Sequence, residues 1–121
     1  MPLGQDDRRF RTAPDTRLVL LGYQTTRLST ARAEVDRKRE SLANLATREG
    51  FLLGRIFEEN DVNRPCSALA ALIAEARAAH VQVVGVATIE DLGLLPHVQH
   101  VTRERIEREA GVKVLIAETA P

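Results

Sequence analysis

The sequence has little of what would cross-link it or build an aromatic core. Of 121 residues, one is cysteine, none is tryptophan, and aromatic residues make up 3%. The single cysteine, Cys66, excludes an internal disulfide, so we expect a protein of the reducing cytoplasm. With so few aromatic side chains, the core must consist of leucine, valine, isoleucine and alanine.

Long hydrophobic runs and an excess of one charge are also absent. The longest uncharged stretch, Ala78 to Ile89, is far shorter than the ~20 residues that a bilayer span needs. No basic segment followed by an apolar one opens the chain, so we predict neither a signal peptide nor a membrane protein. Lysine and arginine (17) balance aspartate and glutamate (17), which argues against a general nucleic-acid coat protein.

The charge is nevertheless unevenly distributed. Residues 1–39 carry nine basic and five acidic groups, net +4, and residues 40–121 carry eight and twelve, net −4. A basic cluster in the first third could contact DNA, although such clusters are more often solvated helix faces. Its members are Arg27, Arg32, Arg37, Lys38 and Arg39.

Apolar runs alternate with helical patterns along most of the chain. Residues 1–16 lack any period, and we expect a flexible N-terminal segment followed by one domain over residues 17–121. Alternation of this kind favours right-handed crossovers. We therefore predict an α/β fold, a three-layer sandwich with a mostly parallel four-stranded sheet. The predicted strands are residues 17–25, 51–57, 81–88 and 112–118.

Three helices are predicted between these strands. The first is capped by Ser29 or Thr30 and ends at Gly50, and a polar loop at 58–63 leads to a second that opens at Pro65. The third runs from Pro96 to a glycine at position 111. Their core-facing positions are expected to be Val35, Leu42, Leu45 and Ala46; Leu69, Leu72, Ile73 and Ala76; and Val98, Val101, Ile106 and Ala110.

The loops carry no cofactor signature. Neither a Gly-x-Gly-x-x-Gly turn nor a phosphate-binding Gly-x-x-x-x-Gly-Lys motif is present, so we expect no cofactor. His97 and His100 lack the neighbouring ligands of a metal site, and we expect no metal. Glu90 and Asp91 follow the third strand, where they could act as acids or bases, but solvated loop carboxylates are the commoner case.

One constellation follows the first two strands, at the sheet edge where ligands of parallel sheets bind. Arg27 and Ser29 lie after the first strand, and Arg64 lies after the second. A serine hydroxyl beside guanidinium groups suits attack on a phosphodiester, with the arginines stabilising the transition-state charge. On these residues alone, Ser29 as a plain helix cap is the simpler interpretation.

Four short motifs follow one another along residues 17–118. They are Arg27-Leu28-Ser29-Thr30, the Lys38/Leu42/Ala46/Gly50 spacing, Arg64-Pro65 with Leu69, and Asp91-Leu92-Gly93 before Gly111-Val112. In this order they resemble the N-terminal catalytic domain of serine recombinases, the resolvase/invertase family. The resemblance implies Ser29 as nucleophile, with Arg27 and Arg64 at the phosphate. The candidate DNA contacts Arg32, Arg37, Lys38 and Arg39 come from the basic cluster instead.

The chain departs from that family at the site itself. Where the family has Asp-Arg-Leu-Gly-Arg, this chain has Glu90-Asp91-Leu92-Gly93-Leu94, so both loop arginines are missing and Asp91 replaces one. Lys38 replaces a usual glutamine. If Gly22-Tyr23 sets the register instead, Arg27 falls at the serine position and no nucleophile remains. A carboxylate where charge must accumulate opposes catalysis, so the resemblance is to a degenerate site.

Three functional hypotheses remain open. The first is an inactive resolvase-like module that binds a protein partner or a second copy of itself. The second is a recombinase that performs DNA strand exchange through Ser29 with help from a partner. The third is an inactive DNA-binding relative, weak in affinity because we expect no helix-turn-helix module after Pro121.

Overall fold

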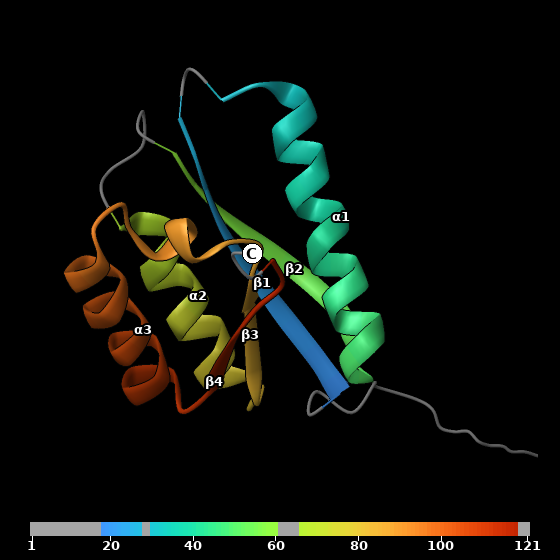
Figure 1. The fold of residues 1–121 in the computed structure, drawn as a ribbon. Helices are drawn as coiled ribbons and strands as arrows, with labels where there is room; N and C mark the ends of the chain where they lie inside the picture. The colour runs from blue at the N-terminus through green and yellow to red at the C-terminus, as the bar shows by residue number, and fades with distance from the viewer. Residues whose placement is uncertain (1–17, 28–29, 61–65, 119–121) are drawn as a thin grey trace, which may run out of the picture.

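The structure is a computed structural model that describes residues 18–27, 30–60 and 66–118. Four parallel strands form one sheet in the order β2-β1-β3-β4, with helices between them in the chain (Figure 1). The elements are β1 (Val19–Thr26), α1 (Arg32–Glu49), β2 (Leu52–Asn60), α2 (Ser67–Ala78), β3 (Val83–Val86), η2 (Ile89–Leu92), α3 (Pro96–Ala110) and β4 (Lys113–Ile116).

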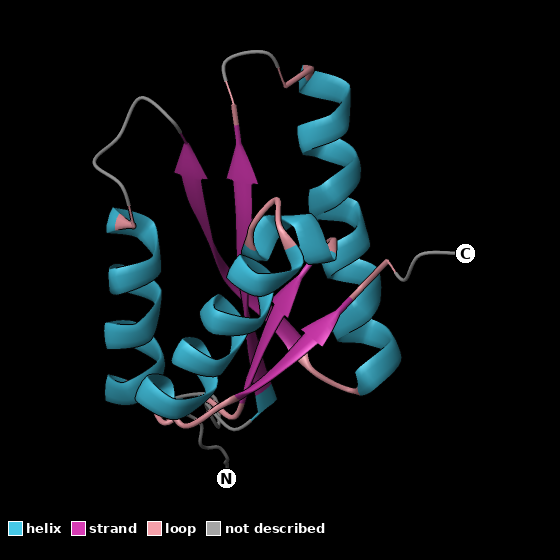
Figure 2. Cartoon of the chain, turned by 60° about the vertical axis from the view of Figure 1, so that its left-hand side comes forward, coloured by secondary structure: helices cyan, strands magenta, loops and turns pink. Residues whose placement is uncertain are grey.

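Helices cover both faces of this sheet, with α1 on one side and α2 and α3 together on the other (Figures 1 and 2). The larger core lies between the sheet and α2 and α3, and a smaller one lies under α1. The predicted three-layer α/β architecture is confirmed. Within the described residues, no helix is both long and apolar enough to span a membrane.

Two glycines of the sheet allow α1 to lie close to it. A Cβ atom added at Gly22 would come within 3.1 Å of Leu42 Cδ1, and one at Gly85 within 3.0 Å of Leu45 Cδ2. Leu42 and Leu45 are 0% and 2% exposed, so neither has free space to withdraw. A larger residue at either strand position would push α1 away from the strands that it covers.

The predicted helix ends are correct where glycine supplies them. Gly50 follows α1 with φ of 82°, and Gly111 follows α3 with φ of 70°, a left-handed conformation that glycine adopts without strain. The start of the first helix was predicted too early, because α1 begins at Arg32 with Ala31 as its N-cap. Thr30 instead bonds back to Arg27.

Other boundaries also differ from the prediction: β3 and β4 are Val83–Val86 and Lys113–Ile116 rather than 81–88 and 112–118. β2 continues to Asn60, where a polar loop was expected from Glu58, because Glu58 and Glu59 pair in register with Gln24 and Thr25 of β1. The second helix begins at Ser67 rather than at residue 65, which lies outside the described residues. Its predicted core face is confirmed, since all four positions are buried: Leu69, Leu72, Ile73 and Ala76.

The predicted core face of the third helix is half wrong. Ile106 and Ala110 are buried, but Val98 and Val101 are 43% and 48% exposed. Because successive helical residues are about 100° apart, Val101 lies about 140° around the helix from Ile106. Gln99 and Arg103 lie on the Ile106 side and are partly buried instead.

Candidate functional site

The candidate site lies where β1 and β3 end, between the start of α1 and η2. Of the three predicted catalytic residues, Ser29 and Arg64 lie outside the described residues. Arg27 is described, and two hydrogen bonds join its backbone to Thr30: its N–H donates to Thr30 Oγ1 at 2.8 Å, and its carbonyl accepts from Thr30 N at 2.9 Å.

A buried ion pair joins the elements of this site. Lys38 Nζ of α1 lies 2.6 Å from Asp91 Oδ1 of η2, and the two side chains are 7% and 0% exposed. The same ammonium donates to the carbonyl of Thr25 at 2.9 Å, near the end of β1. One lysine thus connects α1, β1 and η2 through charge-assisted contacts, which are stronger than neutral hydrogen bonds.

The carboxylate of Asp91 has a full set of donors besides Lys38. The backbone N–H groups of Thr25 and Thr88 each donate to it at 2.9 Å, and the hydroxyls of both threonines lie at 3.2 Å. Asp91 thereby caps η2 and ties it to β1. The prediction of a solvated loop carboxylate is therefore wrong for Asp91, because its oxygens accept hydrogen bonds from backbone groups inside the protein.

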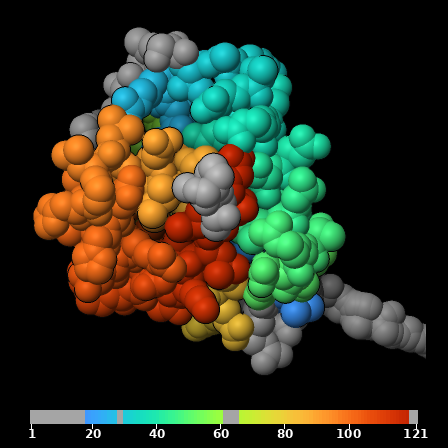
Figure 3. Space-filling view, in the orientation of Figure 1, coloured from blue at the N-terminus to red at the C-terminus, as the bar shows by residue number. Residues whose placement is uncertain are grey.

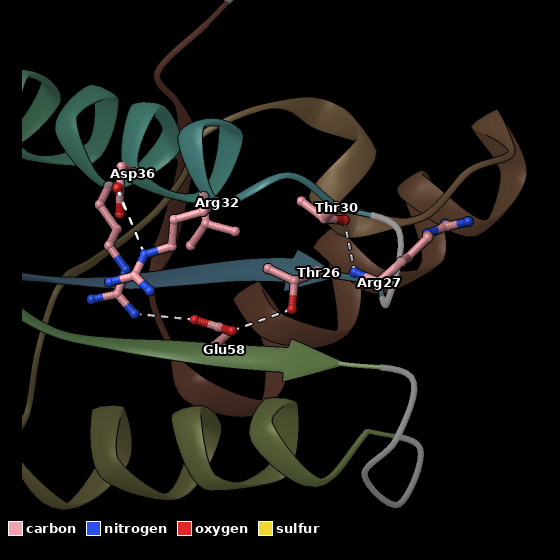
Figure 4. Close-up of a pocket in the computed structure, with 8 residues that line it drawn as sticks. Thr26, Arg27, Thr30, Arg32, Asp36 and Glu58 are labelled. Atoms are coloured by element: carbon pink, nitrogen blue, oxygen red, sulfur yellow. Dashed lines mark hydrogen bonds and ion pairs between the residues drawn. The ribbon is translucent and has the colours of Figure 1, made fainter.

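Three arginines of the basic cluster, Arg32, Arg37 and Arg39, are exposed but paired with carboxylates. Arg32 lies 3.8 Å from Asp36, and Arg39 lies 3.1 Å from Glu58, the carboxylate of β2 that also accepts from Thr26. These residues line a cavity of about 460 Å³ (Figure 4). Its lining holds three guanidinium groups and two carboxylates, so most of its positive charge is locally balanced.

Among the described residues, two cations of the basic cluster are not exposed ion pairs: Arg27 is exposed without a carboxylate partner, and Lys38 is buried with one. Arg27 is exposed, has no ion pair within the described part of the chain, and extends away from Arg32 and Glu58 (Figure 4). Lys38 is buried against Asp91, so its ammonium is not on the exposed face that a DNA phosphate would meet. The described residues therefore leave one unpaired guanidinium next to the strand ends.

A second cavity, of about 230 Å³, lies on the η2 side of Arg27. Its lining holds three cations and three anions, so it has no net charge: Arg27, Arg37, Lys38, Glu34, Glu90 and Asp91. A bound phosphate would need more cationic than anionic charge at this place. The geometry supplies polar contacts here but no excess of positive charge.

The chain after β4 is fastened to α1 beside this cavity. The carboxylate of Glu118 accepts hydrogen bonds from the Arg37 guanidinium and from the Ser41 hydroxyl. The bond from Arg37, then that from Ser41, lowers the pKa of the Glu118 carboxyl below its ordinary value of 4.5. The same carboxylate raises the pKa of the Arg37 guanidinium. Because Arg37 is already paired with Glu118, an added anion would have to compete with that carboxylate.

The opposite face of β1 carries a second polar contact. Tyr23 is 4% exposed, and its hydroxyl donates to Glu59 at 3.4 Å, while Glu59 also accepts from the backbone N–H of Leu69 in α2. Burial, and then the negative charge of Glu59, raises the pKa of the Tyr23 hydroxyl above its ordinary value. Glu59 therefore joins β1, β2 and α2 at this sheet edge.

The sequence-based prediction missed Glu58, Glu59 and Glu118. A signal was available for the first two, because alternation along β2 places adjacent residues on opposite faces of a sheet. No group of three or more histidine, cysteine or acidic residues that could hold a metal occurs within the described ranges. His97 and His100 are exposed on α3, and Cys66 is exposed before α2.

The fold is similar to that of a known recombinase domain. The solved structure of the C-terminal catalytic domain of ISC1926 TnpA, an IS607-like serine recombinase, superposes with a TM-score of 0.65 and 18% sequence identity. The match covers 84% of this chain and 71% of that one. No protein-family model and no curated protein matches the sequence. The resemblance inferred from the motifs is thus confirmed for the fold.

Proposed function

We propose that this chain is a recombinase-like domain that does not catalyse strand exchange and instead acts as a protein-interaction module. The fold is that of a serine recombinase catalytic domain, and the ion pair between Lys38 and Asp91 is the single observation that supports loss of the chemistry. Lys38 and Asp91 both occupy positions at which this chain differs from the serine recombinase motifs that it resembles. They contact each other at 2.6 Å.

Lys38 and Asp91 both differ from the residues that the resemblance implies, and they contact each other. This contact favours two substitutions that compensate each other over two unrelated ones. By the resemblance, a glutamine would stand at Lys38 and an arginine at Asp91. An arginine at Asp91 beside a lysine would place two cations in one buried space, which is unfavourable without an anion. The carboxylate of Asp91 removes that conflict, and the pair then holds β1, α1 and η2 together without any bound phosphate.

The electrostatic cost to catalysis is large. Removing one well-placed donor from a site that stabilises negative charge slows a reaction by about 10²–10³-fold. The resemblance implies that two loop arginines are absent, replaced by Asp91 and Leu94. Arg37 is held by Glu118, which leaves Arg27 as the unpaired cation of the described site. Among the described residues, this single guanidinium is too few to stabilise a pentacovalent phosphorane.

The charge pattern favours a protein partner over DNA. Arg32 and Arg39, two of the predicted DNA contacts, each have a carboxylate partner. A phosphate would have to displace those carboxylates, so few counterions would be released on binding. We expect any retention of DNA on a gel to be weak even at low salt and to change little as the salt concentration rises.

A covalent trapping experiment tests this proposal. The chain is incubated with a pool of nicked duplexes of random central sequence, and the products are separated on a denaturing gel. We expect no protein-linked DNA from either the natural chain or Ser29→Ala. A slow band from the natural chain that Ser29→Ala lacks would refute the proposal and establish strand cleavage through Ser29.

A further inference from the structure

Strand β4 lies at one edge of the sheet, where β3 alone pairs with it among the described strands. The N–H groups of Lys113 and Ala117 both donate to carbonyls on the β3 side, at 3.0 and 2.8 Å. Because the direction of bonding alternates along a strand, the backbone groups of Val114 and Ile116 point to the open side. Such outward-pointing backbone groups are a template on which another strand can add.

Two side chains of α3 occupy the open side of β4. Glu107 accepts a hydrogen bond from the N–H of Val114, and Arg103 donates one to the Val114 carbonyl, both at 3.1 Å. The two side chains also lie 3.5 Å apart and are 41% and 37% exposed. Figure 3 shows the surface of α3, in orange, beside that of β4, in red. The Arg103–Glu107 pair therefore makes, at Val114, the two backbone contacts that an added strand would make.

The residues of this strand make the edge prone to strand addition. Residues 112–117 read Val-Lys-Val-Leu-Ile-Ala, with one charged residue and neither proline nor glycine. A six-residue segment of high β-propensity and low net charge is the kind that stacks with other strands. Leu115 and Ile116 are only partly buried, so apolar side chains accompany the outward-pointing backbone groups.

The opposite edge of the sheet is protected in a different way. The register of β2 against β1 shifts between Leu53 and Ile56, and such a bulge interrupts the regular row of backbone groups that a new strand needs. The exposed Arg55 lies at this shift, and a charged residue on an edge also opposes pairing. The register of β4 against β3 is continuous. The β4 edge therefore depends on the side chains of α3 for its cover.

We propose that the Arg103–Glu107 pair closes the β4 edge to the backbone of other chains and so prevents strand addition to this sheet. The inference is independent of the proposed function. A second pair on α3 provides a comparison, because Arg105 and Glu109 have the same residue types at the same spacing. Their side chains contact each other and Arg108 instead of β4. Removing that second pair leaves both contacts to Val114 in place.

Binding of a strand probe tests the proposal. The probe is a fluorescein-labelled peptide with the sequence of residues 112–118, and fluorescence anisotropy measures its affinity. Arg103→Ala/Glu107→Ala frees both backbone groups of Val114, so we expect it to bind the peptide about tenfold or more tightly than the natural chain does. Arg105→Ala/Glu109→Ala is the matched control and is expected to bind the peptide as the natural chain does. A peptide N-methylated at alternate residues lacks the pairing N–H groups and is expected to show no gain.

Two single variants keep the test independent of folding. Glu107→Ala removes only the acceptor of the Val114 N–H, and we expect a smaller gain with an unchanged circular dichroism spectrum. Glu107→Gln keeps an oxygen at that place, so we expect no gain. The proposal is overturned if neither alanine variant of Glu107 binds the peptide more tightly than the natural chain does. An equal gain in the Arg105→Ala/Glu109→Ala control, or with the N-methylated peptide, would overturn it too. None of these outcomes alters the covalent trapping result.

Discussion

Replacing Lys38 by methionine should cost this protein a large part of its stability. The substitution keeps the volume of the side chain but leaves the carboxylate of Asp91, which is 0% exposed, without a counterion. Removing one partner of a buried ion pair typically costs about 3–5 kcal/mol. The hydrogen bond from Lys38 to the Thr25 carbonyl is lost as well. The loss is large because the total free energy of unfolding of a small domain is only about 5–15 kcal/mol.

Urea unfolding followed by circular dichroism measures this loss. With a slope of about 1–3 kcal/mol per molar urea, a loss of 3 kcal/mol moves the midpoint by about 1 M or more. Arg32→Met is the control, because it breaks an ion pair whose side chains are 91% and 63% exposed, and such pairs contribute at most about 1 kcal/mol.

A double-mutant cycle separates the pair from its surroundings. Asp91→Asn leaves Lys38 buried without an anion, and the Lys38→Met/Asp91→Asn double variant should be more stable than the sum of the two single losses predicts, with a coupling of about 0.5–3 kcal/mol. Equal midpoints for Lys38→Met and Arg32→Met, or strictly additive losses, would refute the argument that this pair holds the strand ends together.

Three further predictions concern other contacts. Glu118→Gln should lower the free energy of unfolding at neutral pH, because the lowered pKa of Glu118 shows that its ionised form stabilises the folded state. The difference from the natural chain should disappear as the pH falls below 4.5 and the carboxylate is protonated. Urea midpoints measured across this pH range check it. Tyr23→Phe should reduce the loss of stability above pH 10, since the raised pKa of Tyr23 makes the folded state lose its proton later than the unfolded state; alkaline unfolding curves check it. Gly85→Ala should cost about 1–3 kcal/mol by pushing Leu20 and Leu45, whereas an alanine cost near zero would show that α1 can shift freely.

Most of the fold could be predicted because its signals are local. Val83 to Val86 form an uncharged run that is buried throughout, and the glycines after α1 and α3 mark the helix ends. The outer face of α3 was not predictable in the same way. Val98 and Val101 fit a helical period, but the face of α3 that packs against the core is the one with Ile106. Which face packs inward depends on the contacts of α3 with β4 and α2.

The position of the candidate site in the fold could be predicted from the sequence, but the side-chain contacts within it could not. The ends of β1 and β3 do meet at one sheet edge, as parallel topology requires. The partner of Asp91 was hidden, because Lys38 is 53 positions earlier in the chain and its spacing suggested a basic exposed face instead. Pairing across such a separation follows from tertiary packing, which residue patterns along one helix do not encode.

Intact-mass spectrometry of the chain after incubation with the duplex pool tests the absence of strand-exchange chemistry at its source. We expect the unmodified mass alone, both for the natural chain and for Ser29→Ala. An added oligonucleotide mass that maps to the peptide containing Ser29, and that Ser29→Ala abolishes, would contradict the account.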